Sequence, residues 1–244
     1  MELVLRLLMI PSVLIALTVH EVSHGYAAYR LGDPTARSLG RLSLNPLRHL
    51  DIVGTLCMLF LGFGWAKPVP INPRNFKNPR VDMAKTAFAG PLSNILLAFF
   101  SIPFYLLLLS LVPQLRGAGV VGLFAEYFGL FLFYFQLLNL SLALFNLLPV
   151  PPFDGSRIFY LLLPKKWHYR ILRHERGLYF FMLAWLLLGN FVRDFLRVIP
   201  VIAHTPFLYT AAGFFSLTGW LTGAVEIISR WMTAFWQLIL FFLP

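Results

Sequence analysis

Long apolar stretches separated by short polar segments dominate the pattern along this chain. They cover residues 3–29, 84–112, 120–148, 177–192 and 207–228, and a shorter apolar tail covers 231–243. A helix needs about 20 apolar residues to cross the hydrocarbon core of a bilayer. The pattern therefore predicts an all-α polytopic membrane protein with about 5–6 transmembrane helices at that length per span.

Residues 39–72 break this pattern. Prolines and glycines interrupt their apolar positions, and the apolar run at 52–63 is too short to span a bilayer. We expect strands and a re-entrant or interfacial piece here, on the cytoplasmic side, forming a small membrane-associated β element near residues 39–72. Lipid cannot satisfy unpaired backbone groups, so this element should pack against helices or line a wet cavity.

The first apolar stretch resembles a secretory signal peptide only in its position. Its apolar run continues through His20 and His24, and its N-terminal end holds a single base, Arg6, with Glu2 nearby. These features favour a retained helix over a cleaved leader. We expect one integral membrane domain over residues 1–244, with a motif-bearing core at about 3–165 and C-terminal helices at about 177–244.

Composition supports a membrane protein and excludes two other classes of protein. The chain is 59% apolar and 12% charged, whereas soluble domains are typically ~45–50% apolar and ~25% charged. So high an apolar content excludes intrinsic disorder. Cys57 is the single cysteine, which excludes a disulfide scaffold.

The net charge of +10 is unevenly distributed. Basic residues gather at 30–85 and 165–176, and Arg116 is the one basic residue between 87 and 156. Under the positive-inside rule both basic segments face the cytoplasm. We expect a multi-pass protein of a prokaryotic cell membrane that contacts anionic lipid. Nucleic acid is not an expected partner, because no soluble basic face is available.

Acidic groups are costly inside a span, so those at membrane depth are functional candidates. The first span contains His20-Glu21-Val22-Ser23-His24. On a helix His20 and His24 share one face and can reach one ion, and zinc favours such nitrogen ligands. Glu21 stands where a carboxylate can take a proton from water beside the metal. The alternative is a buried polar cluster that only joins neighbouring helices.

Two histidines need a third ligand, and Asp154 is the natural candidate. It follows Pro149, Pro151 and Pro152, which stop the helix before it and fix an extended segment. Gly155 permits a tight backbone directly after it. The alternative is a plain helix-ending turn in which Asp154 caps the next helix.

A third motif, Gly90-Pro91-Leu92-Ser93-Asn94, lies within the second span. Gly90 allows close approach of a neighbouring helix, and Pro91 breaks a helical hydrogen bond. Asn94 is an amide at membrane depth. It either donates to an oxyanion beside the metal or makes an interhelical hydrogen bond.

Taken in order, these three motifs resemble those of the site-2 protease family of intramembrane zinc metalloproteases. Residues 41–46 and 64–73 resemble the family's stretch after the first motif, and the resemblance covers about residues 10–165. It indicates a compact form without a PDZ or CBS domain.

The resemblance implies one zinc ion per chain, held by His20, His24 and Asp154, with Glu21 as general base. It implies that Asn94 helps to hold the substrate or the oxyanion. The implied reaction is hydrolysis of peptide bonds in or near the transmembrane segments of membrane proteins. An edge of the β element would bind the substrate as an added strand.

The main rival is a membrane metal transporter or a metal-binding protein without protease activity. Such a protein does not need Glu21 between the ligands, and the sequence lacks the internal repeats typical of transporters. A second metal site at His49 and Asp51 is a weaker hypothesis. We expect His49, beside Arg48, to be a solvated loop histidine.

Overall fold

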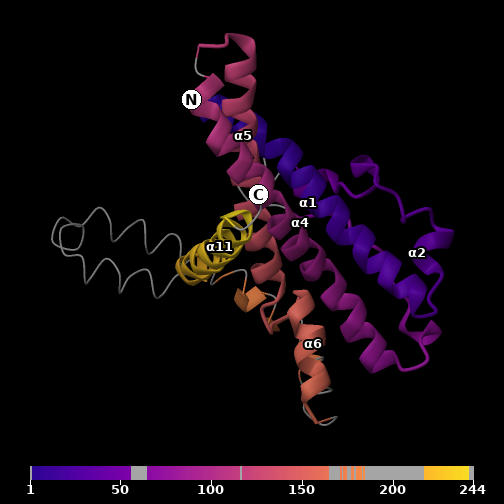
Figure 1. Ribbon diagram of the computed structural model, residues 1–244. Coiled ribbons are helices and arrows are strands. Elements are labelled where there is room, and N and C mark those ends of the chain that lie inside the picture. Colours follow the sequence, from indigo (N-terminus) through magenta and orange to yellow (C-terminus); the bar gives the residue numbers. More distant parts are fainter. Residues whose placement is uncertain are drawn as a thin grey trace.

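The computed structural model describes residues 2–55, 65–115, 117–164 and 217–241, and nine scattered positions between 171 and 184. Figure 1 shows the helices in this part of the chain. In chain order, the helices whose full bounds are described are α1 (Glu2–Arg30), α2 (Thr35–Ser38), η1 (Pro46–Arg48), η2 (Pro73–Asn75), α4 (Pro79–Leu115), α5 (Val120–Asn146), α6 (Asp154–Leu162) and α11 (Leu217–Phe241).

Four of the described helices are long and apolar enough to cross a membrane. Their candidate spans are Leu7–Arg30, Pro79–Leu115, Val120–Asn146 and Leu221–Phe241. The first three confirm the spans predicted at 3–29, 84–112 and 120–148. The four helices are consistent with a multi-pass membrane protein. The span predicted at 177–192 lies largely outside the described residues.

The sequence predicted a span at 207–228 and a separate tail at 231–243. This prediction is wrong, because the described parts of both segments form one helix. Residues 207–216 lie outside the description, and α11 then runs unbroken to Phe241. Arg230 donates to Glu226 at 2.7 Å, one turn earlier on the helix. Opposite charges four residues apart stabilise a helix, so the pair does not interrupt it.

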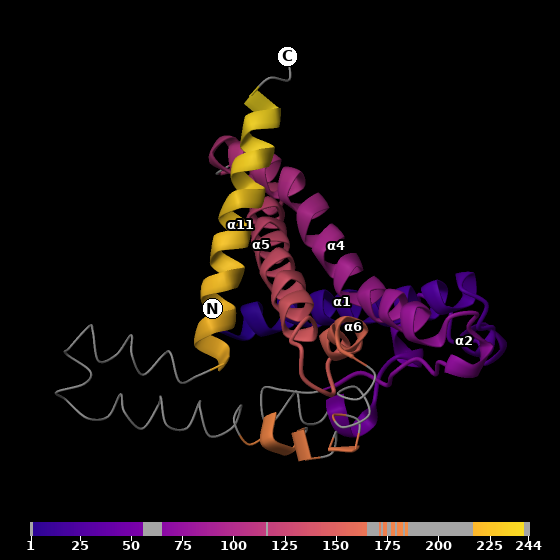
Figure 2. The same ribbon diagram turned by 90° about the horizontal axis from the view of Figure 1, so that it is seen from below.

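The long helices alternate in direction. His24 contacts Thr86 and Ala16 contacts Asn94, so α1 and α4 run antiparallel. Asn94 also contacts Asn139 on α5, which begins five residues after α4 ends. Figure 2 shows the C-terminal end of α11 close to the connection between α4 and α5. Helix α11 is therefore parallel to α4.

Local chemistry explains how α4 begins and why it continues. Pro79 occupies its first position, where a missing N–H costs nothing. The Asp82 carboxylate accepts the backbone N–H of Asn78 at 2.9 Å, as in a capped helix start. Helix α4 then passes through Pro91, Pro103 and Pro113 without ending, as membrane helices do when neighbours satisfy the freed backbone groups.

The β element predicted near residues 39–72 is not found in the described parts of that segment. Residues 39–55 and 65–72 contain an isolated antiparallel bridge between Leu50 and Ala66, and no strand. Pro68 and Pro70 have no N–H to donate to a ladder. The N–H groups of Val69 and Asn72 are committed to carboxylates instead. Residues 56–64 lie outside the description.

Asp33 fixes this irregular segment to the end of α1. Its buried carboxylate accepts the backbone N–H of Asn72 at 2.7 Å, the side-chain amide of Asn75 at 2.7 Å, and the N–H and hydroxyl of Thr35. Each carboxylate oxygen thus has partners, as a buried charge requires. Asp33 thus holds residues 72–75 against the end of α1.

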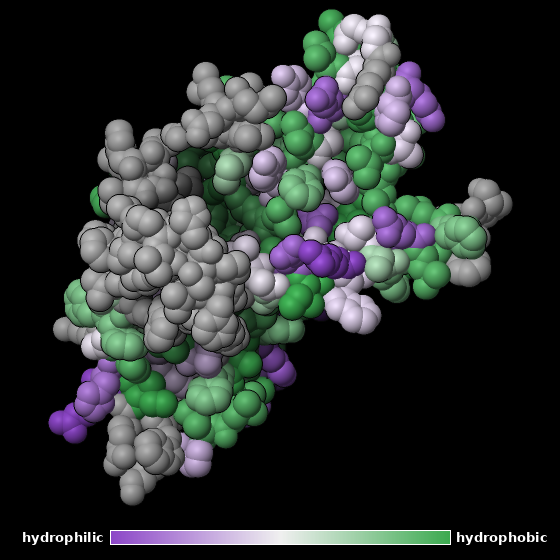
Figure 3. All heavy atoms as spheres, turned by 90° about the vertical axis from the view of Figure 1, so that its left-hand side faces the viewer, coloured by the Kyte–Doolittle hydropathy of each residue, from purple (hydrophilic) through white to green (hydrophobic). Residues whose placement is uncertain are grey.

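Apolar side chains cover the outer faces of the long helices. Large hydrophobic residues of α4 such as Phe100, Phe104 and Leu107 are exposed. Figure 3 shows one face of the molecule, on which hydrophobic side chains of the described residues are widespread between smaller groups of hydrophilic ones. Such a surface is unfavourable in water and suits a hydrocarbon environment.

Candidate metal centre

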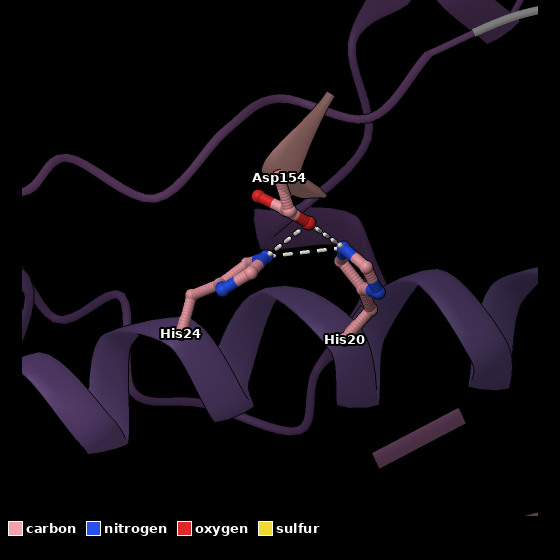
Figure 4. A group of neighbouring side chains, drawn as sticks. All are labelled: His20, His24 and Asp154. Atoms are coloured by element: carbon pink, nitrogen blue, oxygen red, sulfur yellow. Dashed lines mark hydrogen bonds and ion pairs between the residues drawn. The ribbon is translucent and has the colours of Figure 1, made fainter. Parts of the chain in front are cut away.

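His20, His24 and Asp154 meet at one point in the helix bundle. Asp154 Oδ2 lies 3.2 Å from His20 Nε2 and 3.1 Å from His24 Nε2, and the two Nε2 atoms are 3.0 Å apart. Figure 4 shows both rings rising from one helix toward the carboxylate. Both histidines are buried. Two nitrogens and one carboxylate oxygen converging in this way fit a divalent cation such as zinc.

A hydrogen bond at the opposite nitrogen orients each ring. His24 Nδ1 donates to the carbonyl of Thr86 at 2.8 Å, and His20 Nδ1 donates to Oδ1 of Asn94 at 2.6 Å. Protonation at Nδ1 leaves the lone pair on Nε2, which faces Asp154. Partners of this kind commonly fix the tautomer of metal-binding histidines. The donor set therefore fits a metal in chemistry as well as in spacing.

Gly90 gives the two rings their space. A Cβ atom at this position would lie 2.4 Å from His24 Nε2 and 2.7 Å from His20 Cε1. Any side chain there would displace the rings, so the sequence motif has a steric cause. Close approach of α1 and α4 depends on this glycine.

The break between α5 and α6 positions Asp154 beside the histidines. Helix α5 ends at Asn146, and α6 begins at Asp154 after Phe153, which makes no side-chain cap. The Asp154 carboxylate faces the histidines although it lies in the first turn of α6.

Both ends of α6 are fixed to the bundle. A Cβ at Gly155 would lie 2.1 Å from the carbonyl oxygen of Leu147, so only glycine permits this close approach. At the far end Arg80 of α4 donates to the backbone carbonyls of Tyr160, Leu161 and Leu163. A cation is favourable at a helix C-terminus. These contacts hold Asp154 in place.

Glu21 lies beside the ligands and takes no part in the three-residue cluster. Its Oε2 accepts the backbone N–H of Val69 at 2.8 Å. Val69 itself is buried against α1, near Gly25. The extended segment after Ala66 therefore lies over the part of α1 that carries the histidines.

Asn94 is fully buried between three helices. Its Oδ1 accepts from His20, and its Nδ2 donates to the Ala16 carbonyl at 3.1 Å and to Asn139 Oδ1 at 2.8 Å. The amide thus makes interhelical hydrogen bonds to α1 and α5. Both of its N–H groups have protein partners.

Sequence reasoning missed three contributors to this site: Asn139, the Thr86 carbonyl and the Val69 N–H. Backbone groups carry no sequence signal at all. Asn139 was detectable as an amide within an apolar span, which is costly without a partner. No local motif marks it.

The expectation for His49 is wrong. Its ring is buried, and His49 Nε2 donates to the carbonyl of Ser43 at 2.7 Å. Among the described residues, the cluster at His20 is the one group of three or more potential ligands. A second metal site at His49 and Asp51 has no support there.

Comparisons with known proteins agree with this geometry. A model of peptidase family M50 matches residues 118–189. A Bacillus subtilis protein named "Putative zinc metalloprotease YwhC" is 46% identical over 153 residues, which are 63% of this chain and 68% of that protein. No solved structure matches the chain.

Two further relatives match shorter parts of their own length. The Methanocaldococcus jannaschii protein MJ0611 is 34% identical over 108 residues, 44% of this chain and 49% of that protein. The Mycobacterium tuberculosis protein Rip2 is 30% identical over 146 residues, 58% of this chain and 52% of that protein. Both are also named "Putative zinc metalloprotease". With two thirds of a 46% identical relative covered, and a His-His-Asp cluster within a membrane bundle, the chain belongs to peptidase family M50, the site-2 type metalloproteases.

Proposed function

We propose that this protein is an intramembrane zinc endopeptidase that hydrolyses peptide bonds in or near the transmembrane segments of membrane proteins. The observation that carries the proposal is the convergence of His20, His24 and Asp154 inside a helix bundle, with Glu21 adjacent. Membrane metal-binding proteins without catalysis share such ligands. They have no use for a carboxylate at the position of Glu21.

His20, His24 and Asp154 would hold one zinc ion per chain. When bound, zinc in such sites acts as a Lewis acid on a carbonyl and lowers the pKa of water to about 7. Glu21 accepts the proton of the attacking water and returns it to the leaving amine. The Val69 N–H keeps the Glu21 carboxylate beside the ligands during this transfer.

The role we assign to Asn94 is positioning of His20. Its carbonyl oxygen holds the Nδ1 proton of the ring, and both of its N–H groups already have acceptors. A donor engaged in this way has no hydrogen left for an oxyanion.

The substrate is a membrane-embedded protein segment that binds in extended form. A helix hides its carbonyls in internal hydrogen bonds, so the segment must unwind before water can attack. We propose that it pairs as an added strand with the extended chain near Ala66. The Leu50–Ala66 bridge indicates that the backbone there accepts strand pairing.

The site lies near the basic end of the bundle, in the membrane of a prokaryotic cell with the basic loops in the cytoplasm. Arg30 follows His24 at the end of α1, and Arg80 and Lys85 lie at the start of α4. Positive charge favours the cytoplasmic side, and the named relatives are bacterial and archaeal. Anionic lipid is the expected partner of this surface, and nucleic acid is not.

The test uses the full chain purified in detergent and returned to liposomes with zinc and a single-span substrate protein. We expect cleavage that a chelator stops. Glu21→Gln should abolish cleavage and retain zinc. His20→Ala, His24→Ala and Asp154→Ala should each lower the zinc content.

Three results would count against the proposal. Undiminished turnover by Glu21→Gln would show that Glu21 is not the general base. Full zinc occupancy in all three ligand variants would show that the ligand set is wrong. Zinc flux across the liposomes without any cleavage would instead support the transporter hypothesis.

A further inference from the structure

Asn139 lies in the second half of α5, fully buried within a strongly apolar helix. An amide at such a place is costly unless its donors and acceptor are satisfied. Asn139 Nδ2 donates to the carbonyl of Phe135 at 2.8 Å, and Asn139 Oδ1 accepts from Asn94 Nδ2 at 2.8 Å. The side chain is therefore held in one orientation between its own helix and α4.

Backbone carbonyls fix the direction of every bond in this chain of contacts. The Phe135 carbonyl can only accept, so the NH₂ group of Asn139 must face it and the Asn139 oxygen must face Asn94. Asn94 then meets two acceptors on one side, Asn139 Oδ1 and the Ala16 carbonyl. Its NH₂ group must occupy that side.

The orientation of Asn94 determines the tautomer of His20. With its NH₂ group committed, Asn94 can present only its oxygen to His20, 2.6 Å from Nδ1. The Nδ1 atom must then carry the proton, and the lone pair stays on Nε2, which lies 3.2 Å from Asp154. A flipped Asn94 would present N–H to the ring and favour the opposite tautomer.

We propose that Asn139 is a positioning residue for the metal centre. Through Asn94 it fixes the tautomer and orientation of His20, three side chains in series between α5 and α1. This inference rests on the proposed function, because it assumes that His20 binds the metal through Nε2. Outer-shell partners of this kind typically change metal affinity by about 10–100-fold when they are removed.

The experiment measures metal binding, without reference to proteolysis. Zinc affinity of the full chain in detergent is measured by competition with a chelator, and the visible spectrum of the cobalt(II)-loaded protein reports the ligand geometry. Asn139→Leu keeps the side-chain volume and removes the acceptor for Asn94. We expect about 10–100-fold weaker zinc binding and an altered cobalt spectrum.

Gln136→Leu is the matched control. Gln136 is also a buried amide on α5, three residues earlier, and it donates to Ser229 of α11. It has no contact with Asn94 or His20 among the hydrogen bonds of the structure. Its replacement should leave zinc affinity and the cobalt spectrum unchanged.

A second variant background distinguishes a role of Asn139 in orienting Asn94 from a role in helix packing alone. In Asn94→Asp both carboxylate oxygens accept, so the group can hold His20 Nδ1 whichever way it turns. Adding Asn139→Leu to Asn94→Asp should therefore weaken zinc binding far less than it does in the wild-type chain. A purely structural Asn139 would cause the same loss in both backgrounds.

The experiment distinguishes failure of this inference from failure of the proposed function. A wild-type chain that binds no zinc overturns the proposed function as well. Zinc binding by the wild type with equal affinity in Asn139→Leu overturns this inference alone, as would an equal loss in Gln136→Leu. If Asn139→Leu fails to fold, Asn139→Ala removes the same acceptor without added bulk, and the same expectations apply to it.

Discussion

The backbone N–H of Val69 donates a 2.8 Å hydrogen bond to Oε2 of Glu21, although 48 residues separate them. Val69 stands between Pro68 and Pro70, which have no N–H, so it holds the one backbone donor of this three-residue stretch. Residues 68–70 therefore have no other N–H to donate to a β-ladder. Their single donor serves the residue that we propose as the general base.

Replacing Val69 with proline should impair turnover and spare metal binding. Val69 precedes a proline, so its backbone is already restricted to the extended region that proline tolerates. A hydrogen bond to a charged group contributes about 1.5–3 kcal/mol, so we expect roughly 10- to 100-fold slower cleavage. Val69→Ala, which keeps the N–H, is the control, and cleavage rates are compared at equal zinc content. Equal rates for Val69→Pro and Val69→Ala would contradict a role for this donor.

Gly90→Ala should abolish zinc binding. The added Cβ would lie 2.4 Å from His24 Nε2, a separation that real atoms do not adopt, so the rings must move apart. Gly129→Ala is the matched control on α5, where a Cβ meets nothing within 4 Å. Alanine there should even stabilise the helix, by about 0.5–1 kcal/mol. Zinc content after purification measures both variants, and retention of zinc by Gly90→Ala would mean that the rings are not confined as described.

Arg80→Ala should weaken zinc binding from a distance. Arg80 holds the C-terminal carbonyls of α6, and α6 carries Asp154 at its other end. Loss of this contact frees the short helix and should cost about tenfold in affinity, near the low end for outer-shell changes. Lys77→Ala, at an exposed position just before α4, should leave affinity unchanged. Chelator competition measures both, and an equal effect of the two substitutions would point to net charge instead.

Asp33 should make stability depend on acid pH. Burial opposes its ionisation, but hydrogen bonds from Thr35, Asn75 and the backbone of Asn72 outweigh burial and lower its pKa below the usual 3.8. A lowered folded-state pKa stabilises the fold above pH 3.8, and this contribution is lost as pH falls through the folded value. Asp33→Asn should therefore be less stable than wild type at pH 7, with the difference narrowing below pH 3.8. Thermal unfolding of the two proteins across this range checks the prediction, and a constant difference would refute it.

The spans at 3–29, 84–112 and 120–148 were predictable because lipid imposes one rule. A backbone in hydrocarbon must satisfy its own hydrogen bonds, so apolar length alone determines a helix. The same rule failed around Arg230, where the span predicted to end at 228 continues to Phe241. One turn of helix brings Arg230 and Glu226 together as an ion pair. Hydropathy counts each charge separately and cannot include such pairing.

The irregular segment before α4 was predicted least well. Its composition suggested strands, whereas Asp33 and Glu21 take the N–H groups of Asn72 and Val69. The buried His49 belongs to the same error. Long-range partners decide the structure of a segment rich in proline, because its few donors have several acceptors within reach.

The sequence by itself determined the class of protein, three of its spans, and the four residues of the proposed centre, His20, Glu21, His24 and Asp154. Helical spacing and the cost of charge in lipid suffice for that. Only the tertiary structure decided how the centre is held. The Thr86 carbonyl, the space at Gly90, and the Asn94–Asn139 pair come from different helices. Their bonds join residues far apart along the chain, and the direction of a hydrogen bond exists only once the helices pack.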